Sequence, residues 1–484
     1  MARSALNVAI TAGVGVLSRA STQISTVVVT LYAARFLTPE AFGIFAIAAA
    51  WITLVRTMLY CGAFEYLLKE PDARAVSSEC LAVNLIVSVA LSLPLLVIVP
   101  LAPQIFGTAA VGSVLLALIP SNVISAFAAW QESLVLRTGQ LRTYYAVLVA
   151  SEVLSGIAAL ALLTYGYGLY ALVAQIYLRN LIGLVGYLAL RRTTFSRRFL
   201  PSRTLAVLHW SLSRYLSVAL NFASTYGADI VLGILLSPAA AGLYRASNRI
   251  VTAVSDVIAQ PARMMAMAAF SRLAAEGRGA EREWASMTTI AALCGWSALG
   301  GLAVCSPILV PLLLDPQWSG AAAILPILCA ARSTVVLDAI SSTLLVAYNR
   351  QSAVFAIQVA ATAAMLVALL ATSAFGVVPA TVGVLIASIG ASLMIFVYAL
   401  RAFPRAVTEF RAQAPVLLLP VIATVLVAQF AQSAIRATDF PLGLAIALIA
   451  VAGIASWALT LLVLRRRLGA IVTSLHDSEP ALAA

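Results

Sequence analysis

Charged residues are scarce in this chain of 484 residues: Asp, Glu, Lys and Arg together make up 10% of it. Soluble globular proteins carry about 25%, and a soluble chain of this length needs that charge to cover its surface. A water-soluble enzyme, a disordered chain and a coiled coil are therefore excluded. Because 62% of the residues are hydrophobic, the composition predicts an all-α, polytopic membrane protein.

Chemically reactive motifs are also missing. The chain has two histidines, His209 and His476, and contains no Asp-x-Asp, P-loop, GxSxG or HExxH motif. Without a P-loop it cannot be driven by its own ATP hydrolysis. The cysteines each stand alone in apolar runs and are expected to be small buried hydrophobes: Cys61, Cys80, Cys294, Cys305 and Cys329. We predict no enzyme activity, no metal and no cofactor. A membrane polysaccharide polymerase is the less favoured enzymatic alternative.

Apolar runs long enough to cross a bilayer, which takes about 20 residues, recur along the whole chain. They predict about fourteen transmembrane helices, near residues 8–34, 41–63, 79–102, 111–135, 143–165, 168–190, 206–235, 240–268, 285–313, 320–347, 352–374, 377–400, 413–434 and 441–464.

The distribution of basic residues supports this count. With the N-terminus inside the cell, twenty basic residues fall in cytoplasmic segments and two, Arg35 and Arg436, fall outside. Cytoplasmic loops of membrane proteins are enriched in Lys and Arg. The asymmetry predicts a multi-pass protein with both termini in the cytoplasm, and it explains the net charge of +12 without nucleic-acid binding.

A short motif occurs twice, 199 residues apart. Residues 37–45 read Leu-Thr-Pro-Glu-Ala-Phe-Gly-Ile-Phe, and residues 236–244 read Leu-Ser-Pro-Ala-Ala-Ala-Gly-Leu-Tyr. Thr38 or Ser237 can cap the following helix while proline opens its first turn, and the glycine allows close packing against a neighbour.

Both copies of this motif lie between the first two spans of a six-span half. The halves are therefore predicted to be parallel repeats related by an axis along the membrane normal, followed by two extra C-terminal helices. The predicted domains are an N-lobe (1–190, spans one to six), a basic cytoplasmic linker (191–205) and a C-lobe (206–400, spans seven to twelve). Residues 401–484 hold spans thirteen and fourteen and a cytoplasmic tail.

Charges within the predicted spans are the most informative feature, because each costs at least about 2.5–3.5 kcal/mol at bilayer depth and must face a partner or water. In span eight, Arg245, Arg249, Asp256 and Arg263 are separated by 4, 7 and 7 residues and share one helix face. Spans one, two and seven carry similar polar faces. We therefore expect a central aqueous cavity whose excess of arginine favours an anionic, phosphate-bearing cargo. The candidate substrate-binding residues are Arg19, Gln23, Arg56, Arg214, Asn221, Arg245, Arg249 and Arg263, and the ion-coupling candidates are Asp229 and Asp256.

Other intramembrane charges are predicted to pair with one another. Glu152 and Arg179 match in depth, which indicates an ion pair within the N-lobe, and Asp229 and Arg245 match in the same way. Glu132 lies near the cytoplasmic edge, where it is expected to snorkel. Arg332 and Asp338 in span ten are about 240° apart on their helix, so their partners stay unassigned.

The chain resembles the polysaccharide transporters and oligosaccharide flippases (Wzx-like) of the multidrug/oligosaccharidyl-lipid/polysaccharide exporter superfamily. The resemblance rests on the fourteen spans, the duplicated lobe, Arg35–Gly43 and the stretch Leu312–Trp318. It implies a bacterial inner-membrane flippase that moves an undecaprenyl-pyrophosphate-linked oligosaccharide by alternating access. The implied processes are O-antigen, capsule or exopolysaccharide assembly, with a glycan polymerase and glycosyltransferases as partners and a proton or sodium gradient as driving force.

The resemblance also implies roles for particular residues. The diphosphate is expected near Arg19, Arg56, Arg214 and Arg249. Asp229 is the candidate for the cation site of related flippases, but the acid expected on span eleven is missing from residues 352–374, which argues against sodium coupling there. A drug or cation exporter of the same fold is the main alternative, although such a protein should line its cavity with carboxylates.

Overall fold

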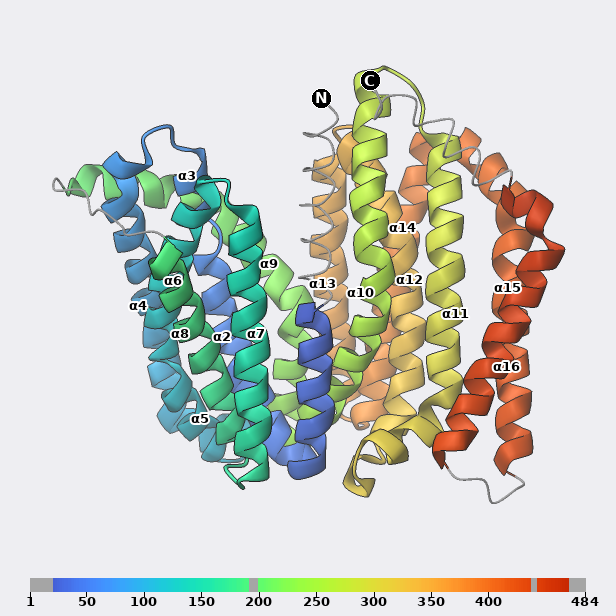
Figure 1. Cartoon of the computed structure of the whole chain (residues 1–484), viewed down its shortest axis with the longest axis horizontal. Coiled ribbons are helices and arrows are strands. Elements are labelled where there is room, and N and C mark those ends of the chain that lie inside the picture. Colours follow the sequence, from blue (N-terminus) through green and yellow to red (C-terminus); the bar gives the residue numbers. More distant parts are fainter. Residues whose placement is uncertain (1–20, 191–198, 437–441, 470–484) are drawn as a thin grey trace. The chain divides into compact units, whose positions relative to one another are not determined.

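The computed structural model describes residues 21–190, 199–436 and 442–469, and all regular elements within these ranges are helices (Figure 1). Twelve of the described helical segments are long and apolar enough to cross a membrane, so the protein is a multi-pass, all-α membrane protein as predicted. Two expected spans are not among the twelve. The structure describes the span at 8–34 only from residue 21, as a helix over 21–36, and the span at 240–268 is α10 (Pro238–Ala275), which carries many charges. The predicted count of fourteen is compatible with this arrangement.

The chain folds into two compact units, unit 1 (Met1–Arg245) and unit 2 (Ala246–Ala484), whose boundary falls inside α10. In unit 1, α9 packs against α2, α3 and α4. The predicted lobes 1–190 and 206–400 were defined by the sequence repeat and not by contacts between residues, so they stay a prediction. The predicted linker at 191–205 stays a prediction as well, because most of it lies outside the described residues. The elements of unit 1 after the helix at 21–36 are α2 (Pro39–Leu59), α3 (Ala63–Lys69), α4 (Ala73–Phe106), α5 (Ala110–Leu118), α6 (Ser121–Arg137), α7 (Leu141–Thr164), α8 (Tyr170–Leu190), α9 (Pro201–Leu235) and the start of α10.

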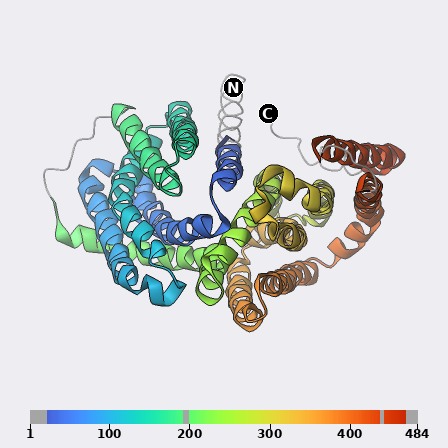
Figure 2. The same cartoon turned by 90° about the horizontal axis from the view of Figure 1, so that it is seen from below.

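Unit 2 is built around α11 and α12, which pack against each other. It contains the rest of α10, α11 (Glu281–Leu313), the short 3-10 helix η1 (Pro316–Trp318), α12 (Ala321–Ala347), α13 (Gln351–Ser373), α14 (Val377–Ala402), α15 (Arg405–Arg436) and α16 (Leu442–Val463). The two predicted extra helices correspond to α15 and α16, which lie side by side at the end of the chain (red in Figures 1 and 2). Since α15 also packs against α11, they form part of unit 2.

Large aromatic side chains form the interior of unit 2. Trp284 of α11 is fully buried, and its ring centroid lies 5.5 Å from that of Phe396 and 5.7 Å from that of Phe410. Its indole nitrogen donates a hydrogen bond of 3.3 Å to Ser341 Oγ on α12. A buried Trp on α11 therefore contacts three other helices, α12, α14 and α15, and still has a partner for its polar atom.

Both copies of the repeated motif begin a helix as the sequence predicts. Thr38 Oγ1 accepts a hydrogen bond of 3.1 Å from the backbone N–H of Ala41, and Ser237 Oγ accepts one of 3.2 Å from that of Ala240. In each copy the next residue is a proline that opens the helix, where a missing N–H does no harm. The predicted capping function of the motif is confirmed in both copies.

Candidate functional site

One predicted site residue, Arg19, lies outside the described residues. The others lie on four helices. Gln23 is half-buried on the helix at 21–36 and Arg56 is half-buried on α2. Arg214, Asn221 and Asp229 lie on α9, while Arg245, Arg249, Asp256 and Arg263 lie on α10, as the spacing predicts. The groupings around these side chains show which charges the fold brings together within each unit.

Arg56 lies in a polar group formed by four helices of unit 1. Its guanidinium carbon is 5.6 Å from the ring centroid of Tyr60, the C-cap residue directly after α2. It lies within electrostatic range of Glu132 on α6 and of Arg179 on α8. A membrane-embedded arginine close to a second arginine needs polar or acidic partners nearby, and Glu132 is such a neighbour within the same unit.

Glu132 does not snorkel to the membrane edge, so that prediction is wrong. Its side chain is buried, and its Oε1 accepts a hydrogen bond of 2.9 Å from the hydroxyl of Tyr144 on α7. The Tyr60 hydroxyl is a second hydrogen-bond partner. A carboxyl group buried against two tyrosines and an arginine has its polar atoms satisfied by the protein. The position of Glu132 along its predicted helix could not reveal these partners, because they come from other parts of the chain.

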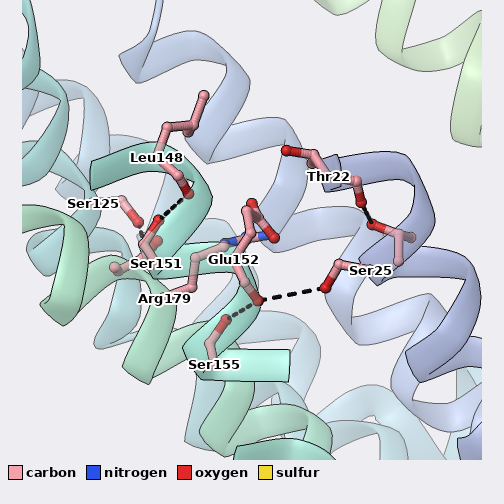
Figure 3. A network of polar contacts seen from close by, with 10 residues as sticks. Thr22, Ser25, Ser125, Leu148, Ser151, Glu152, Ser155 and Arg179 are labelled. Carbon is pink, nitrogen blue, oxygen red and sulfur yellow. Dashed lines mark hydrogen bonds and ion pairs between the residues drawn. The ribbon is translucent and has the colours of Figure 1, made fainter. Parts of the chain in front are cut away.

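The predicted pair of Glu152 and Arg179 is confirmed. Arg179 Nη1 lies 3.5 Å from Glu152 Oε1, joining α8 to α7 (Figure 3). The hydroxyl of Ser25 donates a 3.4 Å hydrogen bond to the backbone carbonyl of Glu152, so the helix at 21–36 contacts α7 at the same place. The first span of the chain is thereby packed beside the polar group that contains Arg56.

The second predicted pair, Asp229 and Arg245, is also confirmed. Arg245 Nη1 lies 2.9 Å from Asp229 Oδ2, and the two side chains are 13% and 0% exposed. The Arg245 guanidinium also lies 4.5 Å from the ring centroid of Tyr226. Both charges are engaged with each other, so ligand binding by Arg245 or ion coupling at Asp229 requires this pair to open.

Arg214 lies at a different place from Arg56. Its Nε is 3.3 Å from Glu65 Oε2 on α3, its guanidinium is 5.9 Å from the ring centroid of Trp210, and its side chain is 56% exposed. Asn221, two turns further along α9, is exposed and accepts a hydrogen bond of 3.2 Å from Thr225. These side chains lie on the surface of unit 1.

In unit 2 the polar face of α10 meets charges on α12. Arg332 Nη2 donates a hydrogen bond of 3.0 Å to Thr252 Oγ1, and Asp256 lies within electrostatic range of Arg332 and Arg263. Asp338, whose partner the sequence left unassigned, lies within range of Arg263 as well. Arg249 is half-buried on the same helix. The part of the predicted stripe that holds Thr252, Asp256 and Arg263 therefore interacts with α12, while Arg245 at its start pairs with Asp229 of α9.

Two residues of the α10–α12 group, Arg332 and Asp338, were not among the candidates named from the sequence. The sequence did contain a signal for them, because a helix whose charges lie on different faces needs polar neighbours on more than one side. Among the described residues no group of three or more His, Cys, Asp or Glu side chains could hold a metal ion.

Sequence comparison links the chain to polysaccharide assembly. The model of the family described as "Polysaccharide biosynthesis protein" matches residues 33–323. The succinoglycan biosynthesis transport protein ExoT of Rhizobium meliloti (strain 1021) is 27% identical over 232 residues. That match spans 46% of this chain and 46% of ExoT, less than half of either protein.

Two solved structures share the fold. The lipid II flippase MurJ in an inward closed conformation matches with a TM-score of 0.76 and 12% identity, over 93% of this chain and 98% of MurJ. A MATE protein in complex with MaD3S matches with a TM-score of 0.51 and 17% identity, over 82% of this chain and 96% of that one. These two matches show the shared fold, and the predicted resemblance to polysaccharide transporters is confirmed by the family match.

Proposed function

Because the chain belongs to the polysaccharide biosynthesis protein family, we propose that it is a flippase for lipid-linked oligosaccharides and not an enzyme. It moves undecaprenyl-pyrophosphate-linked units across the bacterial inner membrane, by alternating access, for exopolysaccharide, capsule or O-antigen assembly. Both termini lie in the cytoplasm, and the flipped units pass to a glycan polymerase. The relative ExoT, named as a succinoglycan transport protein, and the fold shared with MurJ both support this proposal.

The observation that carries the proposal is the presence of arginines inside α2 and α10, which correspond to the second predicted span of each half. Arg56 lies on α2 among polar side chains of unit 1, and Arg249 lies on the polar face of α10 in unit 2. Guanidinium groups bind phosphate oxygens with two parallel hydrogen bonds, and they are tolerated at membrane depth only beside partners or water. We propose that Arg19, Arg56, Arg214 and Arg249 contact the diphosphate while the polyprenyl tail stays in lipid.

A cation exporter of the same fold is the competing function, because a MATE protein shares the architecture. Two carboxylates near the intramembrane arginines are already engaged, since Asp229 is paired with Arg245 and Glu132 is buried against tyrosines. Repulsion of a cationic cargo by Arg56 and Arg249 therefore argues against this alternative.

Flipping in reconstituted vesicles tests the proposal. The full-length protein is placed in proteoliposomes with a fluorescent undecaprenyl-diphosphate oligosaccharide, and the fraction accessible to an outside quencher is followed with time. We expect Arg56→Gln and Arg249→Gln each to slow flipping by about tenfold or more, as expected for lost charge-assisted hydrogen bonds. Arg401→Gln, which removes an exposed arginine at the end of α14, is the control and should flip at the wild-type rate. Wild-type vesicles that flip no lipid-linked glycan but expel a cationic dye would overturn the proposal in favour of the exporter.

A further inference from the structure

A group of aromatic and charged side chains lies where α3 and α9 meet, at one end of unit 1. We define the Trp210 cluster as Glu65, Tyr66 and Lys69 of α3 with Trp210 and Arg214 of α9. Lys69 Nζ lies 5.5 Å and the Arg214 guanidinium 5.9 Å from the Trp210 ring centroid. The Tyr66 ring meets the same indole edge-on at 5.3 Å. Two cations are therefore held beside one aromatic ring.

These cations keep their charge available. Cation–π contact positions an ammonium or guanidinium group without neutralising it. The only carboxylate paired with Arg214 in the part of the chain that the structure describes is Glu65, at 3.3 Å, and the two side chains are 56% and 39% exposed. An ion pair with that exposure contributes little to stability. Glu70 bonds Tyr66 beside the cluster and Arg203 lies nearby, so three cations face two acids there. This excess of positive charge allows Arg214 to exchange Glu65 for a stronger anion.

The first half of α9 has the pattern of a helix at a membrane–water interface. Leu205, Leu212 and Leu216, spaced 7 and 4 residues apart, are 68%, 54% and 69% exposed on one face. Arg203, Trp210 and Arg214 repeat the same spacing on another face. Such two-faced helices lie with leucines toward the acyl chains and basic residues at headgroup level, where Trp is also enriched. Figure 1 shows the first turns of α9 (green) running across the end of unit 1 that carries α3.

The anion that fits this position is a lipid phosphate. Arg203, whose guanidinium reaches the backbone carbonyl of Ala75 at 3.4 Å, adds a further cation at the same end. A diphosphate carries more negative charge than the single phosphodiester of a phospholipid, and it presents more oxygens to Lys69 and Arg214. We propose that the Trp210 cluster is a docking site for the diphosphate of the lipid-linked substrate on the cytoplasmic leaflet, an inference that rests on the proposed function. Arg214 then meets the substrate before Arg56 and Arg249 do.

Glu65 makes this proposal sharply testable, because it competes with the ligand for Arg214. If the cluster only held α3 against α9, then Glu65→Gln and Arg214→Gln would have the same effect, since each breaks the same ion pair. If the cluster docks a diphosphate, the two changes have opposite effects on binding. Lys69→Gln and Trp210→Leu should weaken binding in the same direction as Arg214→Gln.

The measurement is equilibrium binding of undecaprenyl diphosphate to the full-length protein in nanodiscs of zwitterionic lipid. We expect about tenfold weaker binding for Lys69→Gln and Arg214→Gln and about threefold tighter binding for Glu65→Gln, as charge-assisted contacts are lost or released. Arg401→Gln should bind as the wild type does. Phosphatidylglycerol added to the disc serves as the second arm, and it should compete only weakly.

The possible outcomes separate this inference from the proposed function. Wild-type protein that binds undecaprenyl diphosphate, with Lys69→Gln, Arg214→Gln and Glu65→Gln unchanged, overturns the docking site and leaves the flippase untouched. Phosphatidylglycerol that competes as well as the diphosphate overturns it too, in favour of a general phospholipid contact. Wild-type protein that binds no polyprenyl diphosphate at all contradicts the proposed function itself.

Discussion

Gly43 of α2 and Gly242 of α10 are packed against each other's helix start within unit 1. A methyl group added at Gly43 would overlap the carbonyl oxygen of Pro238, and one added at Gly242 would overlap that of Pro39. The two glycines occupy the same position in the two copies of the repeated motif. The two copies therefore contact each other reciprocally, as surfaces at a two-fold axis do. The predicted close packing of each glycine is confirmed, and its neighbour is the other copy of the motif.

This contact predicts that Gly43→Ala and Gly242→Ala force the starts of α2 and α10 apart. Backbone atoms cannot yield as a side chain can, so each variant should lose at least about 1–3 kcal/mol of stability, as overpacked sites do. The measurement is thermal unfolding of the detergent-purified protein. Gly390→Ala in the interior of α14 is the matched control, because nothing lies within 4 Å of the added methyl group. The close contact would be disproved if Gly43→Ala and Gly390→Ala unfolded at the same temperature.

The buried pair of Asp229 and Arg245 predicts a strong non-additive effect. Asp229→Asn and Arg245→Gln should each destabilise the protein by roughly 3–5 kcal/mol, because each leaves one charge buried without its partner. The double variant Asp229→Asn/Arg245→Gln should lose less than the sum of the two single changes. Thermal unfolding of all four proteins completes this cycle, and strictly additive losses would show that the two side chains do not stabilise each other.

The hydrogen bond between Tyr144 and Glu132 predicts a cost for removing one hydroxyl group. Tyr144→Phe keeps the ring but leaves a buried carboxyl oxygen with one donor fewer, which should cost about 1–3 kcal/mol. Tyr167→Phe is the control, since that tyrosine is 60% exposed in the turn between α7 and α8. Equal unfolding temperatures for the two variants would contradict a stabilising hydrogen bond between Tyr144 and Glu132.

The contact between Thr252 and Arg332 predicts a difference between two small substitutions on α10. Thr252→Ser keeps the hydroxyl that accepts from Arg332, whereas Thr252→Val keeps the shape and removes the acceptor. Thr252→Val should therefore be less stable than Thr252→Ser by about 1.5–3 kcal/mol, the range for a hydrogen bond to a charged group. The readout is thermal unfolding, with flipping in proteoliposomes as a second measure. Equal unfolding temperatures for the two variants would contradict a stabilising hydrogen bond from Arg332 to Thr252.

Helix positions were largely predictable from the sequence, since a span is recognised by the local density of apolar residues. The expected spans at 143–165 and 320–347 correspond closely to α7 (Leu141–Thr164) and α12 (Ala321–Ala347). The expected span at 79–102 was too short, because α4 runs over Ala73–Phe106; Pro94 and Pro100 lie inside the expected span, and Pro103 lies just beyond its end. Proline is tolerated within membrane helices when neighbouring groups satisfy the freed carbonyls, and hydropathy does not report such extensions.

Partners of the charged residues were only partly predictable. Matching depth was enough to pair Glu152 with Arg179 and Asp229 with Arg245, because each pair lies on helices that are consecutive in the chain. It was not enough for Glu132, which is satisfied by tyrosines from two other helices. Nor was it enough for Arg332, whose hydrogen-bond partner Thr252 is 80 residues away in the sequence.

The amino-acid sequence alone determined the all-helical membrane character, the approximate spans, the duplicated helix start and the helix face that carries each intramembrane charge. These properties depend on residues within a few turns of one another, so hydropathy and the 3.6-residue period are sufficient to find them. Only the tertiary structure decided that the two glycine motifs face each other, that Glu132 is buried, and that Arg214 joins Lys69 and Trp210. Those relationships depend on which helices pack together, and that choice is made by side-chain shape over the whole unit rather than by any local pattern.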